Sequence, residues 1–160
     1  MTTYRIDDVD RQILNLLQKD ARYTAIELAE RVGVSDNTIH NRMGRLEEEG
    51  VITGYTARVD HNRTGLSLFF LFICTARVSE RSDVADAVLA LPQVVEVTEV
   101  MSGEENLLVK VYGAEDEDIT HVAEELDGLA LRVNDEKLIK VEHSQPLDYV
   151  EVEDIVSLEE

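Results

Sequence analysis

Hydrophobic residues in the first fifty positions recur at three- and four-residue steps, which is the period of an amphipathic helix. This pattern predicts three helices around one small core. The first covers about Asp7 to Asp20, the second opens at Thr24 with capping-box spacing to Glu27 and closes at Gly33, and the third has Ser35 as N-cap and ends at Gly50.

The segment that follows, residues 51–59, is rich in β-branched residues and is broken by Gly54. Such a segment predicts a short hairpin. Helix, helix, four-residue turn, helix and hairpin together form a winged helix-turn-helix, which is a device for reading DNA.

Strand and helix periods alternate in the rest of the chain. The predicted order is strand 66–77, helix 80–91, strand 94–101, strand 106–112, helix 118–126 and strand 131–143. This βαββαβ order predicts a ferredoxin-like sandwich, so the whole chain belongs to the α+β class. Both helices of such a sandwich cover one face of the sheet and leave the other face bare.

The first of these strands is apolar on both faces, although a half-exposed strand should alternate. We expect a second copy of the chain to cover the bare face, sheet against sheet, in a dimer or larger oligomer. The expected interface residues are Leu66, Leu68, Phe69, Phe70, Leu71 and Phe72. The alternative is that the acidic C-terminal tail covers this face.

The charge is acidic and uneven, with 34 Asp and Glu against 15 Lys and Arg. Residues 1–64 carry a net charge of −2 and residues 65–160 a net charge of −17, so the two parts should meet different partners. The expected division is a DNA-binding domain at 1–60, a linker at 61–65, a ligand-binding and oligomerisation domain at 66–147 and an acidic tail at 148–160. So acidic and Lys-poor a chain is interpreted as adapted to high salt, and an ordinary acidic protein is the alternative.

The third predicted helix turns a polar face away from its core residues Ile39, Met43 and Leu46. Asn can pair with adenine, and Arg with guanine or phosphate, so this face has the groups needed to read a major groove. The expected DNA contacts are Ser35, Asn37, Thr38, His40, Asn41, Arg42 and Arg45. A merely solvated helix face is the alternative.

Several runs in this region resemble the Lrp/AsnC family of leucine-responsive transcription regulators. They are Ile6–Leu14, Asp20–Thr24, Leu28–Ser35 and Arg42–Tyr55. The resemblance implies dimers that assemble further, binding to double-stranded promoter DNA, and modulation by an amino acid or a related metabolite. It also implies an effector site near the turn between the second and third strands of the sandwich.

In the family this turn carries a Gly followed by an aromatic–Asp pair. Here Gly103 matches, whereas Glu105 and Asn106 replace the aromatic residue and the Asp. Asn106 cannot supply a formal charge for an α-ammonium group, although Glu104 or Glu105 could compensate. The predicted effector site is Gly103, Glu104, Glu105 and Asn106.

Other chemistry finds little support in the sequence. Cys74 is the only cysteine, so no internal disulfide is expected. The longest apolar run has nine residues, which is too short to cross a membrane. No secretory leader opens the chain, so we expect a cytoplasmic protein. His121 beside Glu125 is a weak metal signal, and neither a metal, a cofactor nor a catalytic residue is predicted. A siroheme decarboxylase-like enzyme of the same architecture is the alternative function.

Overall fold

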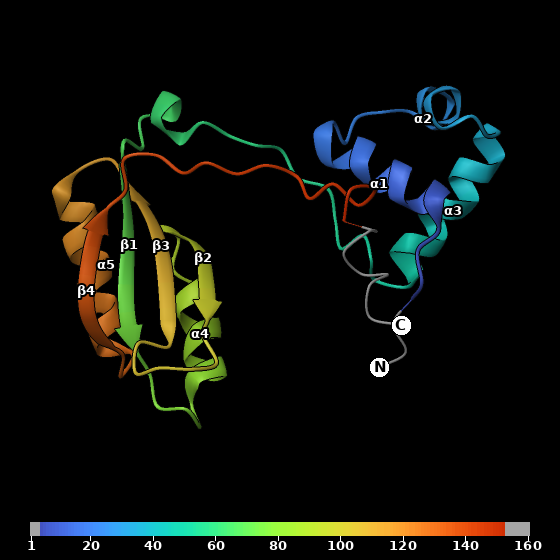
Figure 1. The fold of residues 1–160 in the computed structure, drawn as a ribbon. Helices are drawn as coiled ribbons and strands as arrows, with labels where there is room; N and C mark the ends of the chain where they lie inside the picture. Colours follow the sequence, from blue (N-terminus) through green and yellow to red (C-terminus); the bar gives the residue numbers. More distant parts are fainter. Residues whose placement is uncertain (1–3, 153–160) are drawn as a thin grey trace. The chain divides into compact units, whose positions relative to one another are not determined.

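The computed structural model describes residues 4–152 and divides the chain into two compact units. The first unit contains the chain up to Arg58 together with the segment from Ser144 onward, and the second contains Val59–His143. Figure 1 shows helices alone in the first unit and a sheet with helices in the second.

The first unit contains the three predicted helices, α1 (Asp8–Lys19), α2 (Ala25–Val32) and α3 (Asp36–Glu48). Their caps explain their bounds. Thr24 and Glu27 form the predicted capping box, the Ser35 hydroxyl accepts from the backbone N–H of Thr38, and Gly33 ends α2 in the left-handed conformation at φ 83°.

One apolar cluster joins these helices. Its buried members are Ile13, Leu14, Leu17, Leu28, Ala29, Ile39 and Leu46. Burying each of the large side chains contributes about 1.5 to 3 kcal/mol, which fixes α3 on the other two helices.

The hairpin predicted over residues 51–59 is wrong, because the structure describes this segment as irregular backbone. The backbone N–H groups of Val51 and Ile52 both donate to the carbonyl oxygen of Leu46, so the first residues of the expected hairpin close α3 instead. The remaining residues are mostly exposed, and an isolated two-stranded hairpin is only marginally stable.

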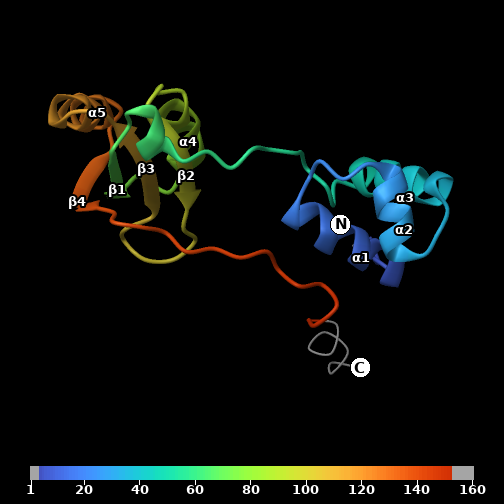
Figure 2. The same cartoon turned by 90° about the horizontal axis from the view of Figure 1, so that it is seen from above.

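The second unit confirms the predicted βαββαβ order. Its elements are a 3-10 turn, η1 (His61–Thr64), followed by β1 (Leu68–Thr75), α4 (Arg81–Leu89), β2 (Val94–Glu99), β3 (Leu107–Gly113), α5 (Asp116–Gly128) and β4 (Arg132–Leu138). The strands form one antiparallel sheet in the order β2-β3-β1-β4. Both helices cover the same face of it, as Figure 2 shows from above.

The last strand ends earlier than the predicted 131–143. It pairs with β1, which begins at Leu68, so the chain beyond Ile139 has no neighbouring strand to bond. A register shift between Ile73 and Cys74 leaves Asn134 as an extra residue, because Cys74 faces Val133 and Ile73 faces Asp135.

Alternate residues of β1 face opposite sides of the sheet, and this corrects part of the predicted oligomer interface. Phe72 is fully buried in the core under α4 and α5, and Leu68 and Phe70 pack against the same core. Phe69 and Leu71 lie on the other face, and Leu66 precedes the strand. Of the predicted set, only Phe69 and Leu71 are therefore strand residues that a partner sheet could contact.

The face away from the helices remains apolar in its middle. Phe69 stacks on Tyr112 with ring centroids 4.3 Å apart, and Ile73 lies opposite Leu108 on β3. Lys110, opposite Leu71, pairs with Glu96 at 3.0 Å and Glu142 at 2.8 Å. We call Phe69, Leu71, Ile73, Leu108, Lys110 and Tyr112 the open face.

The expected alternative, that the acidic tail covers the open face, is not what its described residues do. Residues 148–152 belong to the first unit, where Tyr149 packs on the helical core. Residues 153–160 lie outside the described part of the chain. Among the described helices, none is both long and apolar enough to span a membrane.

Candidate functional site

The outward face of α3 is polar and largely unoccupied. Asn37, His40, Asn41 and Arg45 are exposed along it. Ser35 and Thr38 are tied to the start of the helix, since the Ser35 Oγ accepts from the Thr38 backbone N–H at 3.1 Å and the two hydroxyls lie 2.8 Å apart. The main groups that this face can offer to another molecule are therefore side-chain amides and a guanidinium.

Arg42 lies on the inner flank of this face and is bound within the unit. Its Nη1 donates to Asp7 Oδ2 at 2.6 Å and lies 3.4 and 3.5 Å from the two carboxylate oxygens of Asp10. Asp10 is 1% exposed and also accepts from the Tyr4 hydroxyl at 3.2 Å. The guanidinium thus joins α3 to the start of α1, and sequence reasoning, which treated Arg42 as a DNA contact, missed this use.

The charges of this contact stabilise one another. Partial burial acts to raise the pKa of Asp7, but hydrogen bonds from the Asp10 backbone and from Arg42 outweigh it and hold the pKa below its usual value. The hydrogen bond to Asp7 raises the pKa of Arg42. The pair therefore stays charged at neutral pH.

Arg45 is exposed on α3 and stacks on the same cluster from outside. Its guanidinium carbon lies 4.9 Å from the centre of the Tyr4 ring. This contact orients the Arg45 side chain but leaves the N–H groups of its guanidinium free of hydrogen bonds to the ring. Arg45 is thus positioned to donate to another molecule.

The end of α3 is held to the following segment by one side chain. The Tyr55 hydroxyl donates to Glu47 Oε1 at 2.8 Å, and burial together with this carboxylate raises the pKa of Tyr55 to about 12. Glu47 therefore fixes the exit of the chain from the helix.

A second candidate site is an open pocket of about 630 Å³ in the second unit, at the end of the sheet where β2 stops and β4 begins. Its lining residues are Ser102, Gly103, Glu104, Glu105, Arg132 and Asn134. Gly103 has φ 95°, which only glycine adopts readily, so it sets the turn of the loop. Three of the four residues predicted for an effector thus line one pocket.

Asn106, the fourth predicted residue, does not line it. Asn106 is 4% exposed, its Nδ2 donates to the Ala76 carbonyl at 2.8 Å, and its Oδ1 accepts from the Ala76 N–H at 2.8 Å. The side chain therefore continues the pairing between β1 and β3 beyond the last strand residues. This corrects the expectation that Asn106 is available to a ligand.

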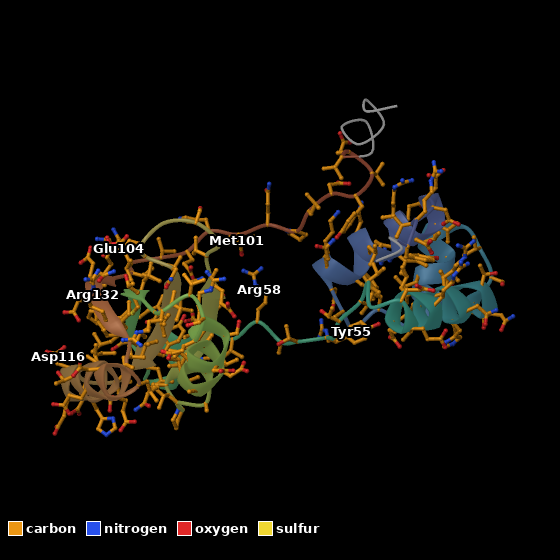
Figure 3. The ribbon with its side chains drawn as sticks, turned by 90° about the horizontal axis from the view of Figure 1, so that it is seen from below. Tyr55, Arg58, Met101, Glu104, Asp116 and Arg132 are labelled. Atoms are coloured by element: carbon orange, nitrogen blue, oxygen red, sulfur yellow. The ribbon has the colours of Figure 1, made fainter. Side chains whose placement is uncertain are left out.

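Arg132 and Asn134 on β4 complete the pocket and were not predicted. Arg132 Nη2 pairs with Glu104 Oε1, and Arg132 Nε donates to Asn134 Oδ1 at 2.8 Å. Figure 3 shows Glu104 and Arg132 beside each other at this end of the sheet. Asn134 is the extra residue of the β4 bulge, and a bulge of this kind has no reliable sequence signal.

The remaining candidate groups have structural roles. Burial raises the pKa of the Cys74 thiol to about 12, so the group stays protonated at neutral pH and does not form the reactive thiolate. His121 Nε2 lies 3.9 Å from Glu125 Oε1 on an exposed turn of α5. In the described part of the chain, no group of three or more His, Cys, Asp or Glu residues is placed to hold a metal ion.

The comparisons with known proteins agree with this arrangement. Residues 6–53 match the family model for winged helix-turn-helix DNA-binding domains. The HTH-type transcriptional regulator LrpA of Pyrococcus horikoshii is 31% identical over 117 residues, which cover 73% of this chain and 82% of that protein.

Solved structures extend the likeness to both units. The leucine response regulatory protein LrpA of Mycobacterium tuberculosis matches with a TM-score of 0.77 and 26% identity, over 91% of this chain and 99% of that one. The transcriptional regulator NMB0573 of Neisseria meningitidis, solved as a complex with L-Met, matches with a TM-score of 0.74 and 26% identity, over 89% of this chain and 96% of that one.

Proposed function

Since the chain belongs to the Lrp family of HTH-type transcriptional regulators, we propose that it binds operator DNA as a dimer or larger oligomer, through the outward face of α3, under the control of a small amino acid-like effector. The winged helix-turn-helix unit itself is a DNA-binding domain.

The observation that carries the DNA contacts is the free face of α3. Asn37 and Asn41 carry amide groups that can bond adenine on two edges, and Arg45 carries a fork that fits guanine or phosphate. We assign base contacts to these residues and to His40, and backbone contacts to Ser35 and Thr38 at the helix N-terminus. Arg42 is left out because Asp7 and Asp10 already occupy its guanidinium.

The open face supports the dimer. Its aromatic and aliphatic side chains are half-exposed in one protomer, and burying each one contributes about 1.5 to 3 kcal/mol. Lys110 would not oppose this contact, because Glu96 and Glu142 already neutralise it within the protomer. Two helix-turn-helix units in one dimer would then bind two half-sites.

The pocket supports an effector with both an acidic and a basic group. Arg132 and Glu104 pair with each other, but both side chains are exposed, so a ligand carboxylate can share the Arg132 guanidinium and a ligand ammonium group can share the carboxylate of Glu104 or Glu105. The Neisseria relative was solved with L-Met, an amino acid with both groups. A regulator with these partners would act in the cytoplasm, where the DNA and the free amino acids are.

Footprinting and gel shifts on operator fragments test the α3 assignment. Asn41→Ala and Arg45→Ala should each lower operator affinity by about five- to 150-fold, corresponding to roughly 1 to 3 kcal/mol per base contact, while the unfolding midpoint stays unchanged. Arg42→Ala is the matched control, since it should lower stability by about 1 to 3 kcal/mol by leaving a buried carboxylate without its cation. Unchanged occupancy in the Asn41 and Arg45 variants would disprove the assignment.

Thermal melts with a panel of amino acids test the pocket. A ligand at a hundred times its dissociation constant should stabilise the protein by about 2.7 kcal/mol, and Arg132→Ala should abolish the shift. No shift with any amino acid would contradict effector binding.

A further inference from the structure

The chain leaves the first unit at Arg58 and returns to it at Ser144. We propose that residues 144–152 are a strap that docks on α1 and gives the second unit a second link to the DNA-binding helices, so that a dimer presents its two α3 helices at a restricted spacing. The strap deepens the proposed function and rests on it. Figure 1 shows this segment returning to α1.

Asn15 on α1 is the centre of the docking contact. Its Nδ2 donates to Asp148 Oδ1 at 2.8 Å, and its Oδ1 accepts from the Tyr149 backbone N–H at 2.9 Å. One turn further along, Gln18 Nε2 donates to the Leu147 carbonyl at 3.1 Å. These contacts hold three successive residues of the strap, through main chain as well as side chain.

The strap also has a structure of its own. Asp148 Oδ1 accepts from the backbone N–H groups of Val150 and Glu151 at 3.0 and 3.3 Å, and the Val152 N–H donates to the Asp148 carbonyl at 3.1 Å. The Glu151 N–H and then the Asn15 amide hold the pKa of Asp148 below its usual value. Tyr149 packs on the helical core, so the folded turn is anchored by apolar burial as well as by hydrogen bonds.

Each link between the units is short and fixed at both ends. In the strap link, Glu142 pairs with Lys110 of the second unit and Leu147 bonds to Gln18 of the first. Four residues lie between these anchors, and the five residue steps of an extended chain reach at most about 18 Å.

The other link is similar. Tyr55 bonds to Glu47 of the first unit, and the His61 ring lies 4.5 Å from the Tyr112 ring of the second. Five residues lie between these anchors, and the six residue steps allow a reach of at most about 22 Å. A unit held by one such link can swivel about it, whereas two links anchored at different places on the unit restrict that rotation.

This restriction matters for a bivalent DNA binder. Once one half-site is bound, the effective concentration of the second helix-turn-helix unit depends on how narrowly its links confine it. A docked strap should therefore sharpen the preference for one half-site spacing. The strap also continues β4, the strand that carries Arg132 and Asn134, so the effector pocket and the strap are parts of one continuous segment.

Hydrogen exchange tests the docking without DNA. In the full-length wild type, the amides of Tyr149, Val150 and Glu151 should exchange at least tenfold more slowly than in an unstructured chain. Asn15→Ala/Gln18→Ala should remove that protection. Gln12→Ala should keep it, because within residues 4–152 the Gln12 side chain bonds only to the backbone of its own helix. Unprotected amides in the wild type would overturn the strap.

Binding to operators of two spacings tests the coupling. We use one fragment with half-sites one helical turn apart and another with five more base pairs between them, plus an isolated half-site. The wild type and Gln12→Ala should discriminate between the two spacings by at least tenfold, and Asn15→Ala/Gln18→Ala by less than threefold, with half-site affinity equal within twofold.

The outcomes separate the two proposals. Lost amide protection in the Asn15→Ala/Gln18→Ala variant with unchanged spacing discrimination would overturn the coupling. Weaker half-site binding in that variant would show that the side chains support the helices themselves, and would also overturn it. If protected wild-type protein bound no operator, the proposed function would fail and the coupling with it, while docking would stand.

Discussion

Individual side chains decide which residues of α3 remain available to DNA. Arg42 and Arg45 are three positions apart and chemically identical, yet Arg42 is bound by Asp7 and Asp10 whereas Arg45 is exposed over a tyrosine ring. The difference comes from the partners in α1 and in the residues just before it, not from α3. In the second unit, Asn106 is likewise unavailable to a ligand, because the backbone N–H and carbonyl of Ala76 bond to its side-chain amide.

The Asp7–Arg42 contact should make stability depend on pH in a predictable direction. Since the pKa of Asp7 is lowered in the folded protein, its stabilising effect is complete above the usual value of 3.8 and is lost as the pH falls through the lower folded value. Asp7→Asn keeps an N-cap but removes the charge, so it should cost about 0.2 to 1 kcal/mol at pH 7 and nothing once wild-type Asp7 is protonated.

Urea denaturation of both proteins between pH 7 and pH 3 measures this difference. The same substitution in an Arg42→Ala background is the control, and there it should have a smaller effect at pH 7. A cost for Asp7→Asn that stays constant across this range would contradict the ion pair.

At the scale of the helices, local signals and packing agree except at one residue of α3. Gly44 lies in the helix interior, where glycine costs about 1 kcal/mol relative to alanine. Apart from the adjoining residues and backbone of its own helix, a Cβ there would meet no described atom within 4 Å. Packing within the unit therefore does not require this glycine, whereas the close approach of DNA proposed for this face would account for it.

Gly44→Ala should consequently raise stability by about 0.5 to 1 kcal/mol and lower operator affinity at the same time. Thermal denaturation and gel shifts on the same preparation measure the two effects. Gly33→Ala is the contrasting control, because Gly33 has φ 83° and an alanine there should destabilise the protein by about 1 kcal/mol or more. If Gly44→Ala bound operator normally, DNA would not approach α3 at this residue.

At the scale of the whole molecule, the proposed assembly rests on the open face, and the acidic charge bears on the affinity for DNA. The open face is half-exposed in the single chain, and the cation among its residues is already neutralised. The net charge of −19 limits electrostatic attraction to phosphate.

Leu108→Glu should dissociate the dimer. Leu108 lies between Ile73 and Thr98 on the open face, so a glutamate there would have no cation directly across from it. Burying two such charges should weaken dimerisation by about 100-fold or more, equivalent to roughly 3 kcal/mol. Sedimentation equilibrium measures this, and Val78→Glu on an exposed loop is the matched control. A dimer that survives Leu108→Glu would require a different interface.

Operator affinity should fall only slowly with salt. If one cation of each protomer neutralises a phosphate, the slope of log affinity against log KCl concentration should be about −2, compared with about −10 for a strongly basic repressor. Glu48→Lys adds one cation per protomer near the end of α3 and should steepen the slope by up to about 2. A steep slope in the wild type would contradict both this interpretation and the proposed adaptation to salt.

Much of the fold follows from the sequence because it is specified locally. The helices, the caps at Thr24 and Ser35, the turn at Gly33 and the βαββαβ order depend on neighbours within a few positions, and all are confirmed. The hairpin over 51–59 failed because its first residues bond to Leu46 of α3, a choice that local propensity does not encode.

The sites divide in the same way. The sequence by itself determined which helix presents amide and guanidinium groups and which loop turns at Gly103, since these depend on residue type and period. Only the tertiary structure decided that Arg42 serves α1, that Arg132 and Asn134 complete the pocket and that the C-terminal segment returns to Asn15. Those partners are separated by tens of residues or more, and a hydrogen bond between distant residues exists only once packing has brought its donor and acceptor together.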